Sequence, residues 1–176
     1  MVNLIDLCEG LCSKYKSHGY SIKPGDIQVL FTSLKNNFNK QRKANKLPPL
    51  NDEQIGELLD GFSKLKYEKL KEYIGTFRDS DKYYLVSEYE AYRDVARYYE
   101  MNIVDGLALV MNLSKIINGQ RNKKKPPLPR LPQKRLNSLI KDYIIPLYKN
   151  KDDLEREVEK LKEWSGNLTE IVLRAE

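Results

Sequence analysis

The chain of 176 residues is long enough for one domain with a hydrophobic core, with or without an added helical hairpin, but too short for two domains of ordinary size. Its 40% of hydrophobic residues excludes a disordered protein, and the lack of a secretory leader or a run of about twenty apolar residues excludes a membrane span and predicts a cytoplasmic protein. The net charge of +6, from 31 basic and 25 acidic residues, is modest, so the distribution of charge is more informative than its total.

The first predicted helix covers about residues 2–16 and ends before Gly19, a residue type that suits the left-handed turn after a helix. Its two cysteines, Cys8 and Cys12, lie one turn apart on the apolar side of this helix. We therefore predict that both are buried as small hydrophobic residues. No metal site is expected, because His18 is the single histidine and further ligands would have to be carboxylates or come from a partner.

Pro24 is predicted to open a second helix, which covers residues 25–45. Its apolar residues recur every three or four positions and leave the basic residues mainly on the other side. We therefore expect one core face and one basic face. Between Ile27 and Asn51 the chain has no Asp or Glu, but it has five basic residues: Lys35, Lys40, Arg42, Lys43 and Lys46.

A third helix follows an extended segment. Pro48 and Pro49 disfavour helix in the residues before them, so residues 47–50 are predicted to be extended. Asn51 followed by Gln54 then predicts the cap of a helix that continues to about residue 77.

The fourth predicted helix, from about residue 80 to 99, carries a stripe of tyrosines that includes Tyr84, Tyr89, Tyr92 and Tyr99. Tyrosines at helical spacing are typical of the rim of a core, and stacking on nucleic-acid bases is the alternative. Arg93 and Arg97 lie one turn apart in this helix and could reach phosphates, although acidic residues nearby weaken their field.

The most apolar helix is predicted at residues 103–118, at the centre of the fold, and Gly119 is predicted to end it. Residues 121–135 then form a basic connector whose four prolines prevent a regular helix. Two amphipathic helices follow, at about residues 136–147 and 154–172. Together these elements predict an all-α fold.

The predicted fold is a helical bundle of about six or seven helices with a basic proline-rich connector and a C-terminal helical hairpin. The predicted division places the bundle at residues 1–120, the connector at 121–135 and the hairpin, which packs on the bundle, at 136–176.

Positive charge is segregated along the chain. Between Asp105 and Asp142 there are nine basic residues and no carboxylate, and the two carboxylate-free tracts leave the rest of the chain with 17 basic and 25 acidic residues. Such segregation attracts phosphates, and an extended connector lets neighbouring side chains reach successive phosphates. The alternatives are a solvated lysine-rich surface, a plain linker, and a proline-rich ligand for an aromatic groove. The predicted nucleic-acid-binding residues are Lys35, Lys40, Arg42, Lys43, Lys46, Arg121, Lys123, Lys124, Lys125, Arg130, Lys134 and Arg135.

No enzyme activity is predicted. The chain has no glycine-rich phosphate loop, no HExxH motif, and no Ser or Cys nucleophile at a recognised spacing from its histidine. No cofactor is expected.

Two helical blocks at residues 27–77 and 84–117, the basic connector at 123–135 and a terminal hairpin make up a small, basic, all-helical chain without catalytic motifs. In this architecture the chain resembles the small subunit of type I CRISPR effector (Cascade) complexes, especially the type I-D version translated from within the large-subunit gene. The resemblance implies a non-catalytic subunit that stacks in several copies of itself and contacts other subunits of the complex. It also implies basic surfaces that hold a guide–target duplex or a displaced strand, so that the partners are RNA or single-stranded DNA.

Two other functions are compatible with the residues. The first is a helical protein-interaction adaptor, in which the tyrosine-rich helix or the C-terminal hairpin binds a partner and the lysines provide solubility. The second is a plasmid or phage replication accessory factor, which would prefer duplex DNA of defined sequence. Steep salt dependence with little sequence preference would favour the CRISPR-type function over both.

Overall fold

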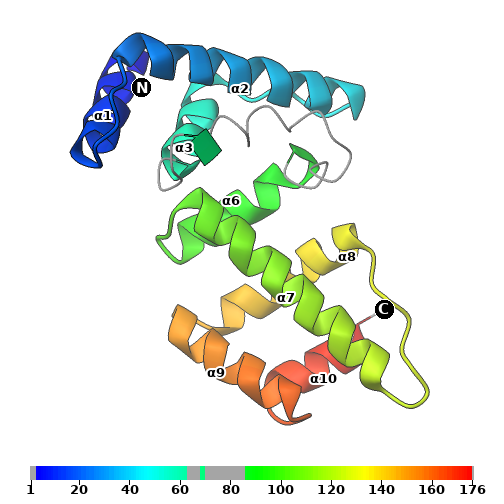
Figure 1. The fold of residues 1–176 in the computed structure, drawn as a ribbon. Helices are drawn as coiled ribbons and strands as arrows, with labels where there is room; N and C mark the ends of the chain where they lie inside the picture. Colours follow the sequence, from blue (N-terminus) through cyan, green and yellow to red (C-terminus); the bar gives the residue numbers. More distant parts are fainter. Residues whose placement is uncertain (1–2, 63–67, 70–85, 176) are drawn as a thin grey trace. The chain divides into compact units, whose positions relative to one another are not determined.

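A computed structural model describes residues 3–62, 68–69 and 86–175 of the chain. In these residues every regular element is a helix and no strand is present, which confirms the all-α fold class (Figure 1). The chain divides into two compact units, unit 1 at Met1–Tyr89 and unit 2 at Glu90–Glu176. None of the helices in the described part is both long enough and apolar enough to cross a lipid bilayer.

Unit 1 contains α1 (Leu4–Ser17), α2 (Pro24–Ala44) and α3 (Asp52–Phe62), and each of the three packs on the other two. The helix α2 begins at its proline, as predicted, because the first turn of a helix needs no N–H from that residue. Before α3, Asn51 Oδ1 accepts a hydrogen bond from the Gln54 N–H (2.9 Å), and Gln54 Oε1 accepts one from the Asn51 N–H (3.0 Å). This reciprocal pair confirms the predicted cap.

The core of unit 1 is built on the apolar face of α2. Ile27, Leu34 and Phe38 on that face have no exposed surface, and full burial of such a side chain stabilises the fold by about 1.5–3 kcal/mol. Cys8 and Cys12 of α1 are only 4% and 3% exposed, which confirms their predicted burial. Burial also raises the pKa of the Cys8 thiol, so this group stays protonated at neutral pH.

Unit 2 is built around one long helix, which contacts three of the segments that follow it. Its segments in chain order are α6 (Tyr89–Tyr98), α7 (Ile103–Lys123), α8 (Gln133–Ser138), the π-helix η3 (Leu139–Ile144), the 3₁₀-helix η4 (Ile145–Leu147), α9 (Lys151–Lys162) and α10 (Asn167–Arg174). The long central helix is α7, so the prediction that the most apolar helix is central holds within unit 2.

The close approach of α6 to α7 depends on Gly106. A Cβ atom at this position would lie 2.5 Å from the carbonyl oxygen of Tyr92 and 2.7 Å from the Ala96 Cβ. The helix backbones can therefore meet only where α7 lacks a side chain. On α6, Tyr89 and Tyr92 have no exposed surface, so these two tyrosines pack in cores rather than being available to stack on bases. Tyr84 lies outside the described residues, as does most of the predicted third helix beyond Phe62.

The structure divides the chain elsewhere than the sequence predicted. The predicted bundle at 1–120 is split after Tyr89, and within unit 2 the helix α7 contacts α8, α9 and α10. Gly119 does not end α7, which continues to Lys123 with Gln120 and Arg121 buried. The predicted last helix is interrupted after Lys162, where Trp164 adopts a φ of 59° that no α-helix contains.

Candidate nucleic-acid interface

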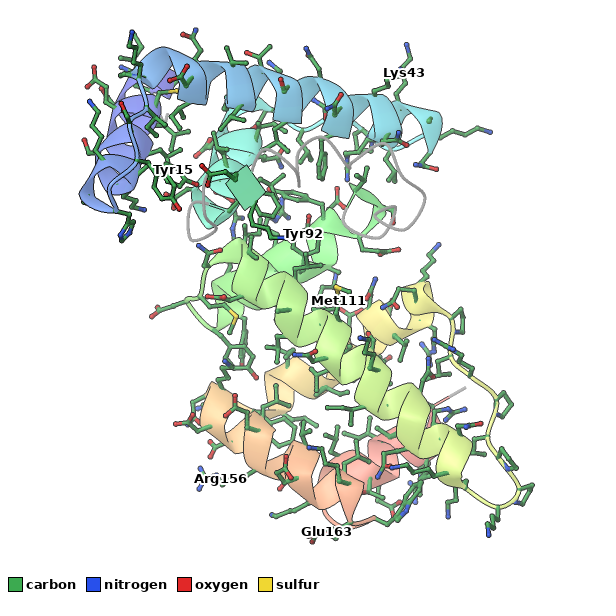
Figure 2. All side chains as sticks on the ribbon, in the orientation of Figure 1. Tyr15, Lys43, Tyr92, Met111, Arg156 and Glu163 are labelled. Atoms are coloured by element: carbon green, nitrogen blue, oxygen red, sulfur yellow. The ribbon has the colours of Figure 1, made fainter. Side chains whose placement is uncertain are left out.

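The predicted basic residues of unit 1 lie along the outer side and the C-terminal end of α2. Lys40, Lys43 and Lys46 are exposed, and Figure 2 shows Lys43 directed away from the neighbouring helices. Lys35 is half-buried and forms an ion pair with Asp52 at the start of α3. Their contact with nucleic acid stays a prediction, but three of these four lysines have the exposure that it requires.

Arg42 is not on this surface. Its side chain is fully buried, its Nε donates a hydrogen bond to the carbonyl of Pro48 (2.6 Å), and its Nη1 donates to the carbonyl of Val86 (2.9 Å). The guanidinium carbon also lies 6.0 Å from the centre of the Tyr89 ring. Burial of a charge requires such partners, and these contacts occupy the fork that a phosphate would need. Arg42 is therefore a structural residue, which corrects the prediction that it contacts a strand.

Arg121 of unit 2 is corrected in the same way. It is 3% exposed, its Nε donates to the carbonyl of Pro129 (3.0 Å), and its Nη1 donates to the carbonyl of Val172 (2.7 Å). Both arginines thus hold the loop that follows their own helix against the C-terminal part of their own unit.

The remaining predicted cations of unit 2 are exposed and lie on the connector and at the start of α8: Lys123, Lys124, Lys125, Arg130, Lys134 and Arg135. The Nζ atom of Lys124 lies 5.4 Å from the centre of the Trp164 ring, a cation–π contact that fixes the start of the connector against the turn after α9. Residues 124–132 form no helix, as the prolines predicted, but the two ends of the predicted connector are helical, residues 121–123 in α7 and residues 133–135 in α8.

Eight exposed cations of the two tracts form no ion pair in the described part of the chain: Lys40, Lys43, Lys46, Lys115, Lys123, Lys125, Arg130 and Lys134. In α9, by contrast, Lys151, Lys160 and Lys162 are each paired with a glutamate on the same helix. Eight of the fourteen cations in the carboxylate-free tracts are therefore exposed without local compensation of their charge, whereas others, such as Lys35 and Lys141, are paired with aspartates.

Each unit holds its loop with one asparagine as well as one arginine. In unit 1, Asn39 Nδ2 donates to the Leu50 carbonyl (3.0 Å) and its Oδ1 accepts from the Leu50 N–H (2.8 Å). In unit 2, Asn118 makes the same two bonds with Leu131, at 3.0 and 2.9 Å. We refer to each asparagine and arginine pair, with the loop that it holds, as a clamp.

The two clamps share a sequence pattern that the sequence reasoning missed. Asn-x-Gln-Arg begins at Asn39 and again at Asn118, 79 positions later, and Leu-Pro-x-Leu follows at residues 47–50 and at 128–131. The N–H of the first leucine in each loop donates to the carbonyl of the clamp arginine, at 2.9 Å in unit 1 and 3.0 Å in unit 2. A search for internal repeats would have found the pattern, although the second copy has two more residues before its loop.

Beside each clamp lies a hollow. The first, about 450 Å³, is lined by Lys35, Asn36, Asn39, Lys40, Lys43, Leu47 and Pro49. The second, about 360 Å³, is lined by Lys115, Asn118, Gly119, Asn122, Leu128 and Arg130. Both are open at the surface and rimmed by cations, so either could take an anionic group.

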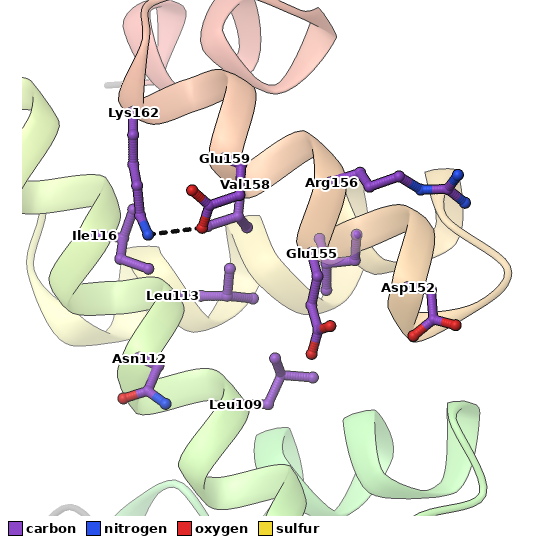
Figure 3. Close-up of a pocket in the computed structure, with 11 residues that line it drawn as sticks. Leu109, Asn112, Leu113, Ile116, Asp152, Glu155, Arg156, Val158, Glu159 and Lys162 are labelled. Carbon is purple, nitrogen blue, oxygen red and sulfur yellow. Dashed lines mark hydrogen bonds and ion pairs between the residues drawn. The ribbon is translucent and has the colours of Figure 1, made fainter.

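A third hollow is a groove of about 610 Å³ between α7 and α9. Figure 3 shows Leu109 and Leu113 of α7 lining it, with Glu155 and Glu159 of α9 at its edge and an ion pair between Glu159 and Lys162 (2.8 Å). None of the predicted nucleic-acid-binding residues lines this groove. Its apolar floor and charged edge suit an apolar side chain of a protein partner rather than a phosphate.

Other titratable groups of the described residues serve the fold. The Tyr99 hydroxyl donates a hydrogen bond to the Tyr148 carbonyl (2.9 Å), and burial, followed by the nearby Tyr98, raises the pKa of Tyr99 to about 12. Burial and the neighbouring Glu157 also raise the pKa of Tyr148. Both phenols are therefore protonated at neutral pH. Among the described residues, no group of three His, Cys, Asp or Glu side chains is placed to hold a metal ion.

Comparison with known proteins gives no relative from which a role could be transferred. No protein-family model, no curated protein and no solved structure matches the chain.

Proposed function

We propose that the chain is a non-catalytic nucleic-acid-binding protein that holds a sugar-phosphate backbone by charge. The observation that carries the proposal is the set of eight exposed cations without an ion pair in the described part of the chain. Uncompensated cations release counterions from nucleic acid when they bind it, which is the main source of affinity in binding that ignores sequence.

The types of residue favour contact with the backbone over recognition of bases. Seven of the eight cations are lysines, which contact phosphate as flexible point charges. Arginine reads a guanine edge with two N–H groups of its guanidinium. The guanidinium groups of Arg42 and Arg121 are buried against carbonyls and cannot make this contact. We therefore expect little sequence preference.

Fluorescence anisotropy with a labelled single-stranded oligonucleotide tests the proposal. The variant K123Q/K124Q/K125Q should bind more weakly than the wild type, and its affinity should depend less steeply on salt, by about 0.7 in the log–log slope for each phosphate that is no longer bound. The variant K151Q/K160Q/K162Q is the matched control, since it removes the same charge from lysines that are paired in α9. Equal weakening in both variants, or no binding of the wild type at low salt, would reject the proposal.

The CRISPR assignment extends this proposal and is supported by the resemblance of architecture and the all-α fold. In that role the chain would act in several copies beside other subunits and hold a guide–target duplex or a displaced strand. Purification of the chain from its native cells tests the assignment: a stoichiometric complex that contains a guide RNA would support it, and a complex without RNA would reject it.

The adaptor remains a second candidate, and the groove between α7 and α9 is the observation that favours it. The occupant would be an amphipathic helix, with its apolar side on the half-buried Leu109 and Ile116 and with basic residues facing Asp152 and Glu155. The substitution L109D should then release the partner without changing nucleic-acid affinity. Retention of the partner by L109D would reject this candidate.

A further inference from the structure

The hollows beside the two clamps correspond position by position. When Asn39 is aligned with Asn118, and the two Leu-Pro-x-Leu loops with each other, all lining residues except Lys35 fall into pairs. The pairs are Asn36 with Lys115, Lys40 with Gly119, Lys43 with Asn122, Leu47 with Leu128, and Pro49 with Arg130. The long helices that carry the hollows, α2 and α7, have the same length of 21 residues. The units therefore contain the same hollow twice.

The floors of the two hollows are fixed by matching contacts. In both units the clamp arginine donates from Nε to the proline carbonyl of the loop, and the clamp asparagine makes two hydrogen bonds with the loop's second leucine. These contacts set the position of Leu47 in one hollow and of Leu128 in the other. The loop backbone is thus held rigidly against its helix before any ligand binds.

The rims of the hollows differ in sequence but agree in chemistry. Apart from Lys35, which is paired with Asp52, the first rim presents Lys40, Lys43 and the carboxamide of Asn36. The second presents Lys115, Arg130 and the carboxamide of Asn122. Each hollow therefore offers two cations and one carboxamide, although no cation of one rim stands at the position of a cation of the other.

From this agreement we infer that the two hollows are equivalent phosphate-binding sites, each of which takes one phosphate-bearing stretch of a single-stranded nucleic acid. The inference rests on the proposed function and adds to it a stoichiometry of two sites in one chain. Each hollow lies toward the C-terminal end of its helix, the negative end of the helix dipole, so the attraction for phosphate has to come from the rim cations. The leucine and the lysine stems supply the apolar contact for a sugar or base.

Two sites in one chain have a consequence for affinity. A long strand that occupies both sites gains from the high effective concentration of the second site once the first is filled. A short strand occupies each site separately. Titration with a short strand therefore gives the number of sites directly, whereas the affinity for a long strand reports whether one strand occupies both sites.

The test uses the full-length chain and its variants K40Q/K43Q and K115Q/R130Q, together with the combined fourfold variant. These rim residues are exposed, and their side chains make none of the clamp hydrogen bonds. Circular dichroism checks that each variant is folded. An oligonucleotide of about six nucleotides, near the lower end of the site sizes of single-strand-binding domains, is titrated by isothermal calorimetry. The variant K151Q/K160Q, with two paired lysines of α9 replaced, is the matched control.

We expect two short oligonucleotides to bind each wild-type or control chain, one to bind each twofold variant, and none to bind the fourfold variant. With a strand long enough for both sites, each twofold variant should bind at least about tenfold more weakly than the wild type. The log–log salt slope should fall by about 1.4, since two phosphates are then no longer bound.

Three other results would overturn the inference, and they separate it from the proposed function. In the first, the wild type binds one oligonucleotide and only K115Q/R130Q abolishes binding, which would show that unit 1 has no site. In the second, the fourfold variant still binds two oligonucleotides, which would place the sites elsewhere. In both cases the chain still binds nucleic acid. Absence of binding by the wild type at any salt concentration would reject the inference together with the function on which it rests.

Discussion

Replacement of Arg42 by methionine should destabilise unit 1 and leave unit 2 unchanged. Methionine has a similar length and can fill the space, but it leaves the carbonyls of Pro48 and Val86 without their donors. A hydrogen bond from a charged donor contributes about 1.5–3 kcal/mol, so removal of both should cost about 3–6 kcal/mol. At about 0.05–0.15 kcal/mol per residue, a unit of this size is stable by about 4–13 kcal/mol, so the cost is a large fraction of the total.

The single tryptophan makes the effect measurable in each unit separately. Trp164 lies in unit 2, so its fluorescence follows the unfolding of unit 2, whereas far-ultraviolet circular dichroism follows the helices of both units. In urea, R42M should show an early transition by circular dichroism and an unchanged transition by fluorescence. The matched variant R121M, which removes the bonds to Pro129 and Val172, should shift the fluorescence transition instead.

The conservative variant R42K separates charge from geometry. Lysine keeps the positive charge but can reach only one of the two carbonyls well, so we expect about half of the destabilisation seen in R42M. Stability of R42M within about 0.5 kcal/mol of the wild type would refute the structural role of Arg42. An equal shift of the Trp164 transition in R42M and R121M would refute the separation of the two units. If folded R42M lost nucleic-acid affinity while keeping its stability, Arg42 would belong to the binding surface after all.

Three further predictions concern unit 2. N118A removes both hydrogen bonds to Leu131 and should lower the stability of the unit by about 1–3 kcal/mol, measured by the Trp164 fluorescence transition. G106A should destabilise the unit, because the added Cβ would overlap the Tyr92 carbonyl. The control is G119A, where an added Cβ meets nothing within 4 Å, and G106A should unfold at a lower temperature than G119A. The pKa of Tyr99 is raised to about 12, so its contribution to stability should be complete below about pH 10 and should decrease between pH 10 and 12. Urea titrations at alkaline pH measure this decrease, and Y99F should abolish it.

Local patterns in the sequence predicted the local structure well. The start of α2, the reciprocal cap of Asn51 and Gln54, and the burial of Cys8 and Cys12 each depend on residues within a few positions of one another. Such features follow from backbone geometry and helical periodicity alone. The extended connector belongs to the same group, since proline cannot donate a backbone hydrogen bond.

The division into units could not be predicted in this way. The apolar residues of α7 indicate that the helix is buried, but periodicity does not indicate which other elements cover it. The helix α7 belongs to unit 2 through its contacts with α8, α9 and α10, and these contacts join residues far apart in the sequence. Gly119 was predicted to end α7 on its type alone, whereas Asn118 and Arg121 on either side of it anchor the loop from within the helix.

The candidate site shows the same limit for charge. Composition and spacing placed twelve basic residues on a surface, and ten of them are exposed or half-buried in the structure. The two exceptions are Arg42 and Arg121, whose partners are carbonyls at positions 48 and 86, and 129 and 172. A count of charges cannot separate an arginine that binds carbonyls from one that faces solvent. The repeated Asn-x-Gln-Arg pattern could have separated them, because it places both buried arginines at the same position of a repeat.

The repeat provides an internal comparison between residues that hold the fold and residues that face a ligand. The clamp has the same residues and matching hydrogen bonds in both units, since a carboxamide can both donate to and accept from a loop backbone and a guanidinium can donate to two carbonyls. The rims differ at every charged position, yet each retains two cations and one carboxamide. A lysine-rich surface that served solubility alone would have no reason to keep this number beside one particular loop. An anionic ligand gives such a reason, because a flexible cation can reach the same phosphate from several positions around a hollow.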